Sequence, residues 1–183
     1  MEKKVFISAN KLYMDSFKLA RKIYLSGFMP DFLIGIWRGG TPPGIIVHEY
    51  FRIKGVDPYH TAIKTQSYKG LRSTGIVEIK GMEHVLREMQ HEHKVLLVDD
   101  VWDTGITIEK VLEYMQKKMG EERMPEVRVA VVYFKEKKNQ TKRRPDYYYR
   151  IINDWIVFPH ELEGLTREEI RRKSKIIEKL VFD

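Results

Sequence analysis

Apolar positions along the chain follow two alternating patterns, one typical of amphipathic helices and one typical of buried strands. Helical spacing covers residues 9–27, 44–55, 82–90 and 107–120, and Pro42 and Pro43 precede the second of these at positions that a first helical turn tolerates. Runs of apolar residues predict strands over 31–37, 59–70, 72–81, 94–100 and 126–134, and an aromatic-rich strand and turn over 147–162. Because helices and strands alternate, we expect an α/β fold with a largely parallel, twisted sheet flanked by helices.

Two polar segments follow predicted strands directly. RGGTPPG follows the strand 31–37, and DDVWDTGIT begins with the last two residues of the strand 94–100. In parallel sheets, ligands bind at the carboxyl ends of the strands. We therefore expect these two loops to form one site.

The second loop combines two chemistries. Asp99, Asp100 and Asp103 place three carboxylates within five residues, and these repel one another unless a cation or a hydrogen-bond donor relieves them. Mg²⁺ or a vicinal diol would do so. Residues 104–107 (TGIT) then open a helix, where backbone amides, hydroxyls and the helix dipole suit a phosphate. A ribose 5-phosphate matches both halves of the loop.

The first loop adds a second site for an anion. Arg38 can bind phosphate with two parallel hydrogen bonds, and Gly39 and Gly40 allow close approach of the backbone. Paired with the acidic loop, this segment indicates a ligand with anionic groups at both ends.

Composition narrows the class of protein. The 183 residues are 43% hydrophobic and 32% charged, include no cysteine, and show no repeat or long linker, so we expect one folding unit over 1–183 without disulfides or thiolate metal sites. No apolar run approaches the roughly 20 residues that span a bilayer, and the N-terminus lacks a signal-peptide pattern. We expect a cytoplasmic protein.

The net charge of +7 is compatible with two kinds of partner, nucleic acid or a highly anionic small molecule. Much of the excess lies in residues 135–144 (KEKKNQTKRR) and 167–179, of which the second has the mixed charges of a solvated helix face. Other families that carry an acidic pair after a strand fit poorly. Only 83 residues follow Asp100, too few for a receiver domain, and the chain has neither a P-loop nor a G-x-G-x-x-G motif.

The segment VLLVDDVWDTGIT closely resembles the signature of the type I phosphoribosyltransferases, which bind 5-phosphoribosyl 1-pyrophosphate (PRPP). IGIWRGGTPPG is similar to the pyrophosphate loop of that family, and the resemblance extends over residues 31 to about 161. VVYFKEK and NDWIVFPHE are similar to segments of the 6-oxopurine salvage enzymes, particularly the xanthine-guanine type. The resemblance implies a core over 28–140, a base-binding hood from 141–165 with residues 1–10 as a candidate second part, and a C-terminal helix over 166–181.

The resemblance also implies roles for individual residues. The acidic pair, Asp99 and Asp100, would hold the ribose hydroxyls and Mg²⁺, directly or through water, and Asp103 would exchange a proton with N7 of the purine. The remaining implied contacts are Asp103, Thr104, Gly105, Ile106 (through its backbone amide) and Thr107 for the 5′-phosphate, Arg38, Gly39 and Gly40 for pyrophosphate, and Lys135, Trp155 and Ile156 for the base.

Three further features follow from the same resemblance. Ser67 and Tyr68 match a Ser-Tyr pair in a flexible loop that closes over the site. A non-proline cis peptide would precede the arginine of the pyrophosphate loop, although Trp37 departs from the family pattern there. The chain would also be a homodimer or homotetramer.

Two functions remain open at this point. One is a Mg²⁺-dependent salvage enzyme that transfers 5-phosphoribosyl from PRPP to N9 of hypoxanthine, guanine or xanthine, giving the nucleoside 5′-monophosphate and pyrophosphate. The alternative is a PRPP-sensing regulator that binds nucleic acid through residues 135–144. The presence of Asp103, Lys135 and Trp155 favours the enzyme, so nucleic acid is not the expected partner.

Overall fold

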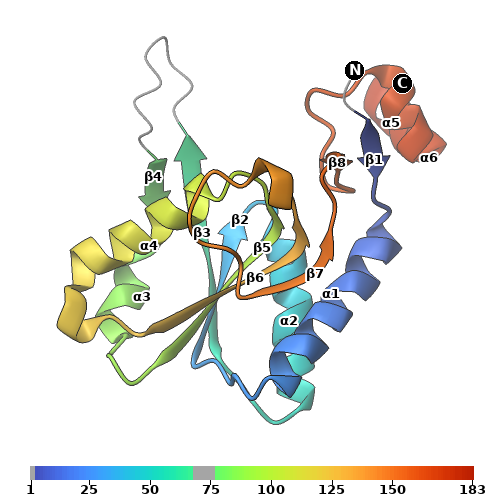
Figure 1. Ribbon diagram of the computed structural model, residues 1–183. Coiled ribbons are helices and arrows are strands. Elements are labelled where there is room, and N and C mark those ends of the chain that lie inside the picture. The colour runs from blue at the N-terminus through green and yellow to red at the C-terminus, as the bar shows by residue number, and fades with distance from the viewer. Residues whose placement is uncertain (1–2, 68–76) are drawn as a thin grey trace.

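The computed structural model describes residues 3–67 and 77–183, and its centre is a six-stranded sheet (Figure 1). The strand order is β4-β3-β2-β5-β6-β7, and every neighbouring pair is parallel except β3 with β4. The strands are β2 (Phe32–Trp37), β3 (Tyr59–Ser67), β4 (Val77–Lys80), β5 (Lys94–Trp102), β6 (Glu126–Phe134) and β7 (Tyr147–Ile151). The predicted largely parallel α/β fold is confirmed.

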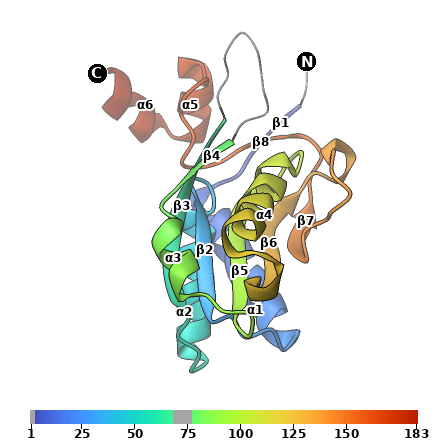
Figure 2. The ribbon, with the colours of Figure 1, turned by 90° about the vertical axis from the view of Figure 1, so that its left-hand side faces the viewer.

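Helices cover both faces of this sheet (Figure 2). They are α1 (Ala9–Leu25), α2 (Thr41–Ile53), α3 (Glu83–Glu88) and α4 (Ile106–Met119), with short 3-10 turns η1 (Glu121–Arg123) and η2 (Glu136–Lys138). Successive residues of β5 point to opposite faces, so Val95 and Leu97 pack with α3 and α4, whereas Leu96 and Val98 pack with α1 and α2. This double burial explains why β5 is a continuous apolar run.

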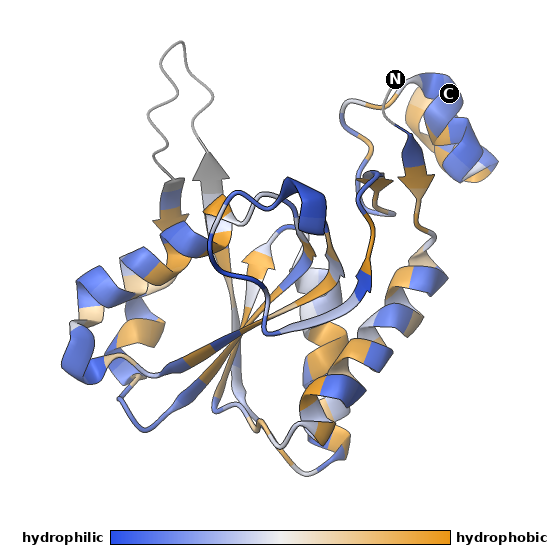
Figure 3. Cartoon of the chain, viewed as in Figure 1, coloured by the Kyte–Doolittle hydropathy of each residue, from blue (hydrophilic) through white to orange (hydrophobic). Residues whose placement is uncertain are grey.

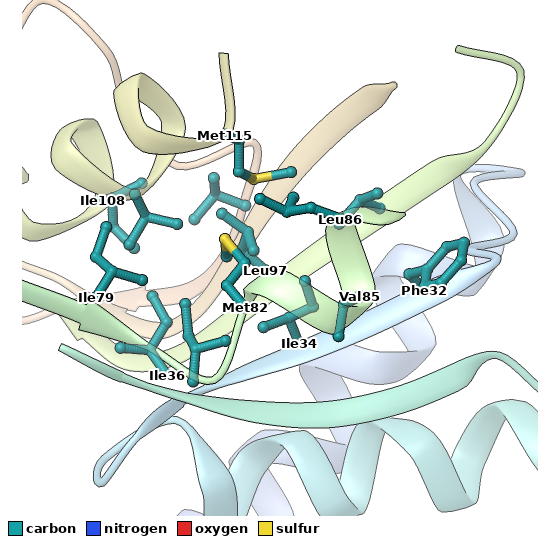
Figure 4. Packing of buried hydrophobic residues seen from close by; sticks show 14 of the residues in the cluster. Phe32, Ile34, Ile36, Ile79, Met82, Val85, Leu86, Leu97, Ile108 and Met115 are labelled. Atoms are coloured by element: carbon teal, nitrogen blue, oxygen red, sulfur yellow. The ribbon is translucent and has the colours of Figure 1, made fainter. Parts of the chain in front are cut away.

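Two hydrophobic layers pack against the sheet, one on each face. Figure 4 shows the layer between the sheet and α3 and α4, where Ile34, Leu97, Met82 and Met115 lie close together. Helices α1 and α4 alternate apolar and polar residues along their length, as expected of amphipathic helices (Figure 3). Among the residues with described placement, no helix is both long and apolar enough to cross a membrane.

A second, two-stranded sheet joins the two ends of the chain. Strand β1 (Lys4–Phe6) pairs in parallel with β8 (Trp155–Val157), and the pairing brings Lys4 opposite Trp155. The Lys4 ammonium also lies 2.5 Å from the Glu169 carboxylate in α5. We call this sheet, with the segment up to residue 165, the hood.

Two local predictions are wrong. The tail forms two helices rather than one over 166–181, α5 (Arg167–Lys173) and α6 (Lys175–Phe182), because Ser174 leaves helical geometry and its hydroxyl caps α6 by accepting from the Ile177 amide. The single strand and turn expected over 147–162 is likewise two strands, β7 and β8, which belong to different sheets.

Candidate active site

The two polar loops meet because their strands are neighbours. Strands β2 and β5 pair in parallel, with Gly35 opposite Val98, so the loops that follow them emerge side by side. The contact is very close: a Cβ added at Gly39 would lie 2.4 Å from the Asp100 carboxylate, and one at Gly40 would lie 2.1 Å from the Val98 carbonyl oxygen. Glycine at both positions is therefore a steric requirement of this loop pair.

The acidic pair lies at the end of β5. Asp100 is only 6% exposed, and its backbone amide donates to the Asp99 carboxylate at 2.9 Å. Burial and the adjacent Asp100 charge both raise the pKa of the Asp99 carboxyl well above its usual range. A cation or hydroxyl donors placed here would relieve that unfavourable electrostatic environment.

Asp99 and Asp100 suit Mg²⁺ that is held partly by water and substrate, rather than a cation held by protein side chains alone. Within residues 3–67 and 77–183, no group of three or more His, Cys, Asp or Glu side chains converges in a way that could hold a metal. Mg²⁺ is commonly bound through one or two carboxylates, with water and substrate phosphates completing the octahedron. Asp99 and Asp100 match that donor set.

The segment predicted to bind phosphate, which we call the phosphate cradle, follows immediately in the chain. Gly105 is the N-cap of α4 with φ +85°, and a side chain there would meet the Trp102 indole nitrogen at 2.6 Å. The Thr104 hydroxyl accepts from the Ile106 amide at 3.4 Å, and the first turn of α4 borders a pocket of about 220 Å³. Its lining contains every predicted phosphate residue except Ile106: Asp103, Thr104, Gly105 and Thr107, together with the acidic pair.

The basic segment 135–144 supports this cradle. Asn139 accepts a hydrogen bond from the Trp102 indole at 3.0 Å, and the Gln140 amide donates to the Thr104 carbonyl at 2.9 Å. Arg144 pairs with Glu136 and stacks over the Phe134 ring. Several polar and basic residues of this segment are therefore engaged within the molecule, a structural role that the charge pattern alone did not reveal.

Asp103 and Lys135 form an ion pair at the mouth of the cradle. The Lys135 ammonium lies 2.8 Å from Oδ2 of Asp103, and Lys135 is buried while the Asp103 side chain is half-exposed. Oδ1 of Asp103 has no hydrogen-bond partner among the described atoms, although it is shielded from solvent. An unpaired buried carboxylate oxygen beside an ammonium suits a ligand that carries both a donor and an acceptor.

The hood brings an aromatic side chain to the same end of the sheet. Trp155 in β8 is half-exposed, whereas its neighbour Ile156 is buried. The segment before β8 is tied to the end of β6, since the Ile152 amide donates to Phe134 and the Lys137 amide donates to the Asn153 side chain. The Trp155 indole is exposed to solvent, and its stacking on a planar ligand stays a prediction.

A second pocket, of about 230 Å³, lies between the pyrophosphate loop and the acidic pair. The Trp37–Arg38 peptide bond at its edge is cis. His160 and Glu161 from the hood also line it, and the His160 Nε2 lies 3.2 Å from Oδ2 of Asp100. Glu163 approaches Arg38 at 3.7 Å. We did not predict these hood residues, although polar residues in a turn directly after an apolar strand were the signal available.

The predicted lid with the Ser67–Tyr68 pair begins at the end of β3. Ser67 ends strand β3 and pairs with Val77 of β4. Tyr68 and the rest of the predicted lid lie outside the described residues. The closing role of this pair stays a prediction.

Comparison with known proteins identifies the class. Residues 7–165 match the phosphoribosyl transferase domain model, and the chain therefore belongs to that family. It is 31% identical to a xanthine-guanine phosphoribosyltransferase of Cereibacter sphaeroides, covering 88% of this chain and 89% of that protein. It is 24% identical to xanthine phosphoribosyltransferase 1 of Saccharomyces cerevisiae, covering 94% and 96%. A purine phosphoribosyltransferase structure from Pyrococcus horikoshii Ot3 is 31% identical, with TM-score 0.69 and coverage of 91% and 98%.

Proposed function

We propose that the protein is a Mg²⁺-dependent purine salvage enzyme that transfers 5-phosphoribosyl from PRPP to N9 of a 6-oxopurine. The observation that carries this proposal is the β5–α4 segment, where the acidic pair, Asp103 and the N-terminus of α4 border one pocket, and where Lys135 from the end of β6 pairs with Asp103. The names of the relatives, which act on xanthine or guanine, support the same substrate class. The products would be a nucleoside 5′-monophosphate and pyrophosphate.

The residues divide the work by chemistry. The first turn of α4, with Thr104 and Thr107, would bind the 5′-phosphate, and Arg38 would bind the pyrophosphate. Asp99 and Asp100 would hold the ribose hydroxyls and Mg²⁺. Bound Mg²⁺ would neutralise charge that develops on the departing pyrophosphate.

The purine would lie between the hood and Asp103. Trp155 would stack on the base, Ile156 would offer backbone groups to its far edge, and the Lys135 ammonium would donate to the exocyclic O6. Asp103 would exchange a proton at N7 as the bond from N9 to the ribose forms. Its free Oδ1 is the atom with capacity for that contact.

The test mixes the protein with PRPP, Mg²⁺ and each of hypoxanthine, guanine, xanthine and adenine, and measures nucleotide and pyrophosphate. We expect turnover with at least one 6-oxopurine and much less with adenine, because a lysine donor matches a carbonyl and not an amino group. No nucleotide from any base, together with tight salt-dependent binding of nucleic acid, would establish the regulator instead. Sedimentation of the same sample tests the expected homodimer or homotetramer.

A further inference from the structure

We propose that His160 is a positioning residue that holds the Asp100 carboxylate in the orientation needed for Mg²⁺-PRPP. This inference rests on the proposed function and extends it to a hood residue that is not part of the phosphoribosyltransferase signature. Its Nε2 lies 3.2 Å from Oδ2 of Asp100, so a segment that follows the base-stacking strand reaches across to the PRPP side of the site.

The Asp100 side chain is also confined by its other neighbours. Its carboxylate lies against the Gly39 backbone, where an added Cβ would come within 2.4 Å, and the side chain is almost fully buried. Asp99 stands next to it and carries a like charge when ionised. An imidazole N–H at this distance from Oδ2 would offset part of this repulsion and leave the other carboxylate oxygen free to accept from a ligand. Both the imidazolium and the neutral tautomer with hydrogen on Nε2 donate from that atom, so either form can make the contact.

The imidazole is itself held in place. Its ring stacks on Phe158 with an interplanar angle of 14° and a centroid distance of 5.4 Å. Lys173 of α5 donates to the carbonyl oxygens of Phe158, Pro159 and Glu161, which surround His160 in the chain. The Phe158 amide in turn donates to the Glu161 carboxylate at 3.1 Å. These internal hydrogen bonds hold the turn, and with it His160, in one orientation. A residue that positions a metal ligand has to be fixed in this way.

Two substitutions separate hydrogen bonding from packing. His160→Phe keeps a ring to stack on Phe158 but has no donor. His160→Gln loses the ring but places an amide N–H near the position of Nε2. His84→Ala, at an exposed histidine in α3, is the matched control.

The measurement is binding of Mg²⁺-PRPP by titration calorimetry without any purine, with thermal denaturation to check folding. Loss of a group that orients a metal ligand typically weakens binding by about 10–100-fold. We expect His160→Phe to weaken Mg²⁺-PRPP binding by about tenfold, His160→Gln to restore most of the affinity, and His84→Ala to match the native protein. KM for the purine at saturating PRPP should not change. Lys173→Met, which loosens the turn and keeps His160, should give a smaller loss of the same kind.

Unchanged Mg²⁺-PRPP affinity in His160→Phe would overturn the proposal. If His160→Gln then lost affinity, the ring of His160 would have only a packing role. Failure of the native protein itself to bind Mg²⁺-PRPP would overturn the proposed function and this inference with it. The two failures are therefore distinguishable.

Discussion

The two halves of the site are built in opposite ways. The proposed PRPP half consists of two short loops whose backbones nearly touch, and Gly39 and Gly40 leave no space for a side chain. The proposed purine half consists of side chains, Lys135 from the end of β6 and Trp155 from the hood, and the indole is half-exposed. Substitutions that enlarge a residue should therefore impair ligand binding in the first half, which we call the addition rule. Substitutions that shorten a side chain should impair it in the second half, which we call the removal rule. Asp103 lies at the boundary between them.

The largest effect on catalysis should come from substitution of Asp103, the residue at that boundary. Asp103→Asn keeps the shape of the side chain but cannot exchange the proton at N7, so we expect kcat to fall by about 10³-fold, with PRPP affinity within about threefold of the native value. Initial rates and calorimetry measure the two parameters separately. Asp100→Asn is the contrasting variant and should mainly damage Mg²⁺-PRPP binding. Similar effects of both changes on both parameters would refute this division of roles.

The addition rule is tested by Gly39→Ala. The new methyl group would overlap the Asp100 carboxylate and force it to turn. Disturbing the support of a metal ligand typically lowers metal affinity by about 10–100-fold, so we expect Mg²⁺-PRPP affinity to fall by up to about a hundredfold. Gly44→Ala, where the added Cβ would only make ordinary contact with Leu33 at 3.7 Å, is the control and should bind normally. Normal binding by Gly39→Ala would contradict the rule.

The removal rule is tested by Trp155→Ala. Loss of one aromatic stack costs about 1–3 kcal/mol, so KM for the purine should rise about thirtyfold while KM for PRPP stays constant. Trp155→Phe should retain most of the affinity. Because the indole is half-exposed, the melting temperature should change little. A parallel rise in both KM values would show that Trp155 supports the whole site rather than the purine half.

The smallest effect concerns the stability of the PRPP half. The pKa of Asp99 is raised in the folded protein, so the native state holds its proton more tightly and loses stability as the pH rises from about 4 through the raised pKa. Asp99→Asn removes this cost and should raise the free energy of unfolding of the ligand-free protein by about 1 kcal/mol at pH 7. Urea denaturation at pH 4, 5.5 and 7 should show the gain growing with pH. A less stable variant at pH 7 would be inconsistent with this electrostatic account.

The same contrast explains what the sequence could predict. The acidic pair, Asp103 and the phosphate turn are contiguous, so their strand–loop–helix context was readable directly, and the alternation of elements predicted the parallel sheet. The turn that carries His160 had a signal in its polar residues, but the contact of His160 with Asp100 was not readable, because it exists only after the hood folds onto β5. The roles assigned to Lys135, Trp155 and Arg38 stay predictions until ligands are bound. The break at Ser174 could have been anticipated, since serine competes with helix continuation by capping the next turn.

The parallel pairing of β1 with β8 has a consequence for synthesis on the ribosome. Lys4 and Glu169, which meet across this unit, are 165 positions apart, so β1 can pair only after the chain has been made as far as β8. The β2–α2 and β5–α4 loops have both been made once Thr107 has emerged, and the supporting segment 135–144 also precedes β8. Pairings of such long range form late because their loop closure is costly in entropy. The proposed purine half, which includes Trp155 of β8, is thus the last part of the site that the growing chain completes.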